Sequence, residues 1–205
     1  MESATLIGGV LVAGLVTFLV GAVAWRLDYQ RPLHEALPAI HRDRRRRAWI
    51  HSWMILGLVV TFAGLVGMTL GLVQPTATVL AGMATAIYGA GAGCWIVALT
   101  FRLTVVPWAA EQAAAGRVPE EFAAYDRWAG ALYVVHMLTA FVGSAVLGMA
   151  MLASDAVPQW LGWTGILWGL AFAGGFVATR FAGPFNPPFW AHLYTGTVGL
   201  VLLLG

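Results

Sequence analysis

Lysine is absent from this 205-residue sequence, and all 11 of its basic residues are arginine. A retinal-type Schiff base or a lysine nucleophile is therefore excluded, because both require a lysine amine. The single cysteine, Cys94, excludes an intrachain disulfide and a CxxC metal or redox motif. Charge is also scarce, since 10% of the residues are charged and soluble domains have about a quarter. A chain of this kind requires lipid as its solvent.

Long apolar runs take the place of charge, and 60% of the residues are hydrophobic. A helix of about 20 residues crosses the ~30 Å hydrocarbon core of a bilayer. The first run is expected to be a retained helix and not a signal peptide, because arginines follow it and none precedes it. The sequence predicts an all-α polytopic membrane protein, a single domain and compact bundle of six transmembrane helices at about 5–25, 49–72, 76–103, 128–152, 158–181 and 189–204.

The arginines predict the orientation of these spans. All of them lie in or beside the loops at 26–48, 104–127 and 182–188, whereas the opposite side carries only Glu2 and Asp155. The positive-inside rule makes these three loops cytoplasmic and places both termini on the non-cytoplasmic side. The predicted location is the cell (cytoplasmic) membrane, and the short loops are typical of bacterial membrane proteins.

The basic cluster of the first loop has two interpretations. Its arginines orient the protein, and they could also hold anionic lipid headgroups at about 1 kcal/mol per basic residue. The residues concerned are Arg42, Arg44, Arg45, Arg46 and Arg47. A nucleic-acid partner is not expected, because the charges are distributed as topology signals.

Two further patterns concern local structure. In the loop at 104–127, Pro119 followed by Glu120 and Glu121 is typical of a helix start. Residues 119–127 are therefore expected to form either a short helix along the inner membrane surface or an ordinary connector. In the second span, Gly57 and Gly64 recur at the seven-residue spacing that lets helix backbones approach closely in lipid.

The predicted spans lack the groups that transport and hydrolysis require. No Asp, Glu or Asn lies well inside a span, and no proline interrupts one. Proton-coupled carriers keep ionisable groups at mid-membrane, and many transporters bind substrate at broken helices, so a small-solute transporter is disfavoured. The stretch around Ser144 also lacks the Gly-x-Ser-Gly nucleophile of a rhomboid-type protease. A non-enzymatic protein is favoured.

Three histidines, His51, His136 and His192, fall in the inner half of the even-numbered spans, and Cys94 lies at a similar depth. Imidazoles on different helices at one depth are how helical bundles hold a b-type haem. The axial pair would be His136 with His192 or with His51. Alternatively, all three histidines, with or without Cys94, could bind a transition metal. The plainer interpretation is that His51 and His192 hydrogen-bond near the membrane boundary.

No span contains two histidines, so at most one haem fits, on the cytoplasmic side, and transfer of electrons across the whole membrane by two haems is excluded. The favoured function is a non-catalytic accessory or hydrophobic-ligand-binding bundle, with lipid, other membrane subunits or further copies of the chain as partners. The sharpest alternative is a redox protein with one haem b or a metal ion.

Overall fold

The structure, a computed structural model, describes residues 2–24 and 32–205, and for Glu2 and His34 it describes the backbone only. Within these ranges the regular elements are seven α-helices and one short 3-10 helix, with no strand. The elements are α1 (Glu2–Ala22), α2 (Leu33–Arg42), α3 (Arg44–Gly71), α4 (Pro75–Ala114), α5 (Phe122–Leu152), α6 (Gln159–Ala178), η2 (Gly183–Phe185) and α7 (Phe189–Leu204). The all-α prediction is therefore confirmed.

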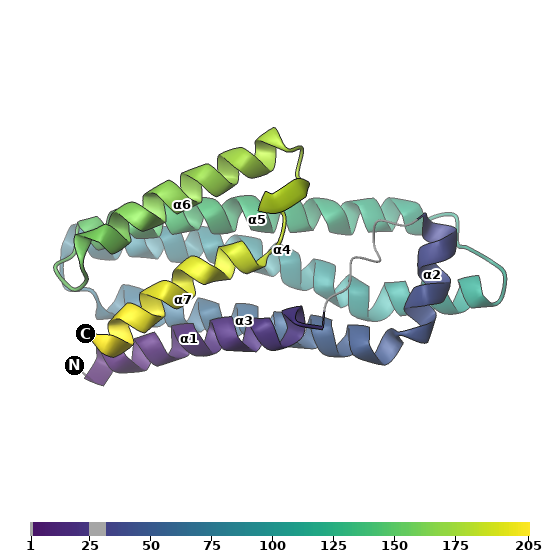
Figure 1. Cartoon of the computed structure of the whole chain (residues 1–205), viewed down its shortest axis with the longest axis horizontal. Coiled ribbons are helices and arrows are strands. Elements are labelled where there is room, and N and C mark those ends of the chain that lie inside the picture. The colour runs from purple at the N-terminus through teal and green to yellow at the C-terminus, as the bar shows by residue number, and fades with distance from the viewer. Residues whose placement is uncertain (1, 25–31) are drawn as a thin grey trace.

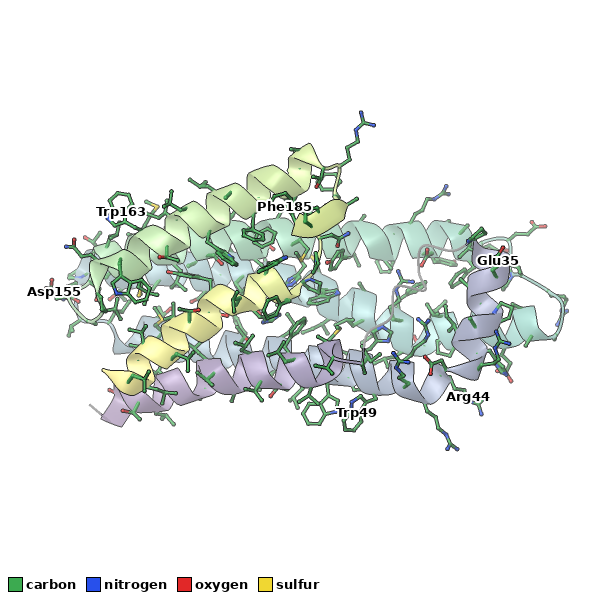
Figure 2. The ribbon with its side chains drawn as sticks, viewed as in Figure 1. Glu35, Arg44, Trp49, Asp155, Trp163 and Phe185 are labelled. Atoms are coloured by element: carbon green, nitrogen blue, oxygen red, sulfur yellow. The ribbon has the colours of Figure 1, made fainter. Side chains whose placement is uncertain are left out.

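Five of these helices, α1, α3, α4, α5 and α6, are long and apolar enough to cross a membrane. The sixth predicted span corresponds to α7, which is apolar but has 16 residues, or about 24 Å at ~1.5 Å per residue. The chain thus has the architecture of a helical membrane bundle. Figure 2 shows Asp155 at one end of it, with Glu35 and Arg44 at the other. Arg26 and Arg31 of the predicted first loop lie outside the described residues.

The long helices form a ring of five with a sixth helix outside it. Around the ring, α1 packs on α3, α3 on α4 and α4 on α5, and α7 closes the ring by packing extensively on α1 and only slightly on α5. The outer helix, α6, packs mainly on α5 (Figure 1). The seam between α5 and α7 is therefore the loosest part of the ring.

Glycines permit the close contact between α1 and α3, as the seven-residue spacing predicts. A Cβ atom at Gly57 would meet the backbone of Phe18 at 2.9 Å, and one at Gly64 would meet the side chain of Leu11 at 2.6 Å. Larger side chains at these positions would separate the two helices, because association in lipid depends on packing.

The predicted loop at 104–127 is mostly helical. Helix α4 continues through Pro107 to Ala114, so its 40 residues extend about 60 Å, roughly twice the thickness of the hydrocarbon core. The pattern at 119–127 does not form a separate surface helix, because α5 begins at Phe122 and runs directly into the membrane span. Strong helix formers between 109 and 114 explain why α4 does not stop at the membrane boundary.

The predicted loop at 26–48 contains helix α2, which sequence reasoning missed. Its buried residues Ala36, Leu37 and Ile40 have the spacing of one helix face. This face packs on the end of α4, where Val106 and Ala109 are also buried. Together, α2 and residues 44–48, 103–114 and 122–127 form what we call the helical head, which α2 crosses at the arginine-rich end (Figure 1).

A hydrogen-bonded turn joins α6 to α7. Arg180 and Phe181 have the positive φ angles of 53° and 62°, a conformation that costs non-glycine residues of the order of 1 kcal/mol each. The Tyr133 hydroxyl donates to the backbone carbonyl and side-chain oxygen of Asn186, and the Asn186 amide donates to the Phe181 carbonyl. These bonds tie the turn to α5 and fix where α7 begins.

Candidate cofactor site

His136 of α5 and His192 of α7 lie together inside the ring, and neither side chain is exposed. Tyr88 of α4 presents its ring to both imidazoles at near-perpendicular angles, with centroid distances of 6.2 Å to His136 and 6.5 Å to His192. Two of the three predicted histidines are therefore brought to one place. They face a tyrosine that sequence reasoning had not selected.

Further aromatic rings stack on the two imidazoles. Trp95 stacks on His136 with a centroid distance of 4.5 Å, and Phe18 stacks on His192 at 4.1 Å. The Thr61 hydroxyl lies 3.5 Å from His192 Nδ1, at the long limit of a hydrogen bond. We call Phe18, Thr61, Tyr88, Trp95, His136 and His192 the central cluster. Each of the five ring helices contributes at least one of its members.

The central cluster contains buried polar atoms that are not hydrogen-bonded. Among the described residues, His136 Nδ1 and Nε2, His192 Nε2 and the Tyr88 hydroxyl have no hydrogen-bond partner. The Gly91 backbone lies near His136 and Thr61 lies near Tyr88, but neither contact has hydrogen-bond geometry. Buried polar groups are nearly always paired, and each unpaired group costs about 1–3 kcal/mol. Four such atoms at one place indicate a site for a ligand, ion or water.

Small residues allow the cluster to form. A Cβ atom at Gly91 of α4 would clash with the Thr139 side chain and lie 3.2 Å from the His136 Cα. The absence of a side chain at Gly91 therefore lets α5 approach α4 closely enough for His136 to lie against Trp95. The glycine-rich centre of the third span thus has a specific role in placing an imidazole.

His51 lies apart from the central cluster. It is buried on α3, ten residues before Thr61, which is about 15 Å along the helix. Arg47, which is also buried, lies one turn before it on the same helix. The structure therefore favours His192 over His51 as the partner of His136 in the predicted axial pair.

The four predicted metal ligands are not brought together. In the part of the chain that the structure describes, no three His, Cys, Asp or Glu side chains are grouped as a metal ion would require. Cys94 is half-buried on α4 and carries a free thiol. A metal ion at His136 and His192 would need ligands of another kind, such as the Tyr88 oxygen or water.

The five arginines predicted to hold lipid headgroups have different surroundings. Arg42, Arg44 and Arg45 are exposed, whereas Arg47 is buried in the helical head at 7% exposure. Arg46 donates to the carbonyl of Ala24, two residues beyond the end of α1, and pairs with Asp43 at 3.5 Å. Of the five, three are therefore exposed, Arg46 is partly exposed and Arg47 is buried.

The sequence also places Tyr133 and Tyr194 near the level of the histidines, where their hydroxyls could form hydrogen bonds that support the imidazoles. Tyr133 and Tyr194 instead donate to Asn186 and to the Leu161 carbonyl, respectively. Tyr88 lies beside both imidazoles instead, and its contact with them is through its ring. The sequence did indicate that Tyr88 could matter, because it is a polar aromatic residue inside the third span on the glycine-rich face. It could not show that Tyr88 meets the histidines, because that depends on how each helix is rotated about its axis.

Comparison of the chain with protein-family models, with curated proteins and with solved structures found no match.

Proposed function

We propose that the chain is a six-span protein of the cell membrane, with α7 as the sixth span and both termini on the non-cytoplasmic side. The arginine distribution supports this orientation. Exposed tryptophans support the two membrane boundaries, because Trp49 and Trp128 lie near the arginine-rich end and Trp160 and Trp163 near the opposite end. The helical head then lies in the cytoplasm, and the central cluster lies in the cytoplasmic half of the membrane.

Within this bundle we propose a redox protein that binds one b-type haem through His136 and His192. The observation that carries the proposal is the pair of fully buried imidazoles whose Nε2 atoms have no hydrogen-bond partner among the described residues. Neutral imidazoles on two helices are suitable axial ligands. When bound, the haem supplies one-electron redox chemistry at iron.

The surroundings of the imidazoles fit such a group. The stacked rings of Trp95 and Phe18 hold the two imidazoles in place and provide an apolar environment. Helices α5 and α7, which carry the two histidines, pack only slightly on each other, whereas α7 packs extensively on α1. Tyr88, which now lies beside both imidazoles, would have to turn aside.

A second candidate is the accessory or hydrophobic-ligand-binding bundle acting with other membrane subunits. The observation that favours it is the filled interior of the ring, where large side chains such as Phe18, Tyr88 and Trp95 are buried. In that case the unpaired polar atoms would hold water or a polar group of a ligand, and the protein would be colourless.

The test is a visible absorption spectrum of the gently solubilised protein, as isolated and after addition of haem, oxidised and then reduced with dithionite. We expect a Soret band that sharpens on reduction. His136→Ala and His192→Ala should each abolish the two-imidazole spectrum. His51→Ala is the matched control, because it removes a buried histidine from the same half of the bundle but outside the cluster.

A protein that stays colourless with haem would contradict the haem proposal. Metal analysis then distinguishes a bare transition ion, which should be lost in the same two variants, from the accessory bundle, which should contain no metal. Loss of the haem spectrum in His51→Ala as well would show that the choice of axial ligands is wrong.

A further inference from the structure

The Thr61 hydroxyl makes a contact that joins two helices of the ring. A threonine hydroxyl inside a helix commonly donates to a carbonyl of the preceding turn, and Thr69, Thr139 and Thr197 do so here. The Thr61 hydroxyl of α3 instead lies 3.5 Å from His192 Nδ1 of α7. Both side chains are fully buried, so the contact belongs to the interior of the bundle.

Helix α1 makes room for this contact. Because α3 and α7 each pack on α1, Thr61 reaches His192 past the side of α1 that faces the ring interior. Gly14 lies on that side, and a Cβ atom there would clash with the Thr61 hydroxyl. Phe18 follows Gly14 by four residues and therefore lies on the same helix face, where it stacks on the His192 ring at 4.1 Å. One face of α1 thus leaves space at Nδ1 and holds the plane of the imidazole.

The two nitrogens of His192 have different surroundings. Nδ1 meets the Thr61 hydroxyl, whereas Nε2 has no hydrogen-bond partner among the described residues. A neutral imidazole carries one N–H, and a hydroxyl oxygen can accept from it. With this proton on Nδ1, the Nε2 lone pair is free to bind a metal. His136 differs, because neither of its nitrogens has a partner within the same part of the chain.

We infer that Thr61 is a positioning residue, whose oxygen accepts a hydrogen bond from His192 Nδ1–H and so keeps Nε2 available for the haem iron. This inference rests on the proposed function and gives the two axial histidines unequal roles. A hydrogen bond on the second nitrogen fixes the tautomer of a ligating imidazole and raises its basicity. A more basic ligand favours ferric over ferrous iron, because the ferric ion has the greater charge. Thr61 therefore lowers the midpoint potential of the haem.

The experiment measures this potential in the full-length protein in detergent. Thr61→Val removes the hydroxyl and should reduce the preference for ferric over ferrous iron by about threefold, which raises the potential by ~30 mV at 59 mV per tenfold for one electron. Thr61→Ser keeps a hydroxyl and should retain the potential of the unmodified chain. The matched control is Thr69→Val, which removes a hydroxyl bonded to the Leu65 carbonyl on the same helix and should leave the potential unchanged.

A second measurement uses the haem-free protein. Nitrogen NMR of isotope-labelled histidine shows which ring nitrogen carries the proton, and the signal of His192 is identified by its loss in His192→Ala. We expect the proton on Nδ1 in the unmodified chain and in Thr61→Ser. In Thr61→Val the acceptor is lost, so the population with the proton on Nε2 should rise severalfold.

Equal potentials in Thr61→Val and the unmodified chain, with the two-imidazole spectrum intact in both, would overturn this inference and leave the proposed function standing. A shift of the same size in Thr61→Ser or Thr69→Val would also overturn it, because the Thr61 hydroxyl would not be the cause. Failure of the unmodified chain to bind haem would overturn the proposed function. The NMR measurement then still decides the hydrogen bond, since a proton on His192 Nε2 in the unmodified chain excludes donation from Nδ1 to Thr61.

Discussion

Trp95 and His136 lie face to face across the contact between α4 and α5, with centroids 4.5 Å apart and ring planes 24° from parallel. This stacking fixes the rotation of the imidazole, which has no hydrogen bond to do so within the described residues. In most ligand sites a histidine is oriented by a hydrogen bond on its second nitrogen. Here an aromatic ring has that role.

Trp95→Leu should therefore weaken haem binding by about tenfold, since the imidazole gains rotational freedom that binding must remove. Titration of the full-length protein in detergent with haem measures this change in affinity. The control is Trp163→Leu on α6, where the tryptophan is 56% exposed and its loss should leave haem binding unchanged. An equal loss in both variants would mean that the effect comes from general destabilisation.

Two tyrosine substitutions should change stability in opposite directions. Tyr88→Phe removes a buried hydroxyl without a hydrogen bond and should raise the free energy of unfolding by about 1 kcal/mol. Tyr194→Phe removes a hydroxyl that donates to the Leu161 carbonyl at 3.1 Å and should lower it by a similar amount. Denaturation of the haem-free protein in detergent measures both. A destabilised Tyr88→Phe variant would mean that the hydroxyl is bonded to Thr61 or to water.

Two glycines of α4 provide a matched pair for helix packing. Gly91→Ala should weaken haem binding and destabilise the bundle by about 1–3 kcal/mol, because its Cβ would meet Thr139 and the His136 backbone. A Cβ at Gly93 has nothing within 4 Å, so Gly93→Ala should be neutral or stabilising by up to ~1 kcal/mol through helix propensity. Similar effects of the two substitutions would disprove the role of Gly91 in placing His136.

The turn between α6 and α7 depends on Tyr133. Tyr133→Phe should lower the free energy of unfolding by about 1 kcal/mol and increase amide hydrogen exchange at 181–188, because the bonds to Asn186 are lost. Asn186→Ala should have a similar effect. If Tyr133 and Asn186 stabilise the turn through the contact between them, their effects should not add. The free energy of unfolding of the double variant should then lie within a few tenths of a kcal/mol of the less stable single variant.

The orientation can be tested with single cysteines introduced into a Cys94→Ser background. A cysteine at Asp155 should react with a membrane-impermeant thiol reagent in intact cells. One at Ala115, at the end of the helical head, should react only after the membrane is opened. The reverse pattern would show that the arginine-rich end faces outward, contrary to the positive-inside rule.

Helix type and approximate spans could be predicted because lipid imposes a simple length and composition requirement on each helix. The same requirement does not act beyond the membrane, so the extension of α4 to Ala114 and the presence of α2 were missed. Both had local signals, namely helix-forming residues at 109–114 and the spacing of Ala36, Leu37 and Ile40. These signals are weak individually and depend on each other, since α2 buries its apolar face on the extension of α4.

The depth of His136 and His192 could be predicted by counting residues from the arginines, and the two side chains do lie together. The separation of His51 could not be predicted reliably, because helix tilt and rotation decide whether a difference of a few residues brings side chains together or apart. Tyr88 was missed for the same reason. Counting residues gives the depth of a side chain along the membrane normal. A site also requires that the side chains point toward one another in the plane of the membrane.

Because α7 closes the ring and carries His192, the central cluster has both imidazoles only after α7 has been synthesised and has packed on α1. The other four ring helices precede it along the chain, so a partly inserted chain presents His136 alone. The haem that we propose would therefore be loaded only after the last ring helix has been inserted.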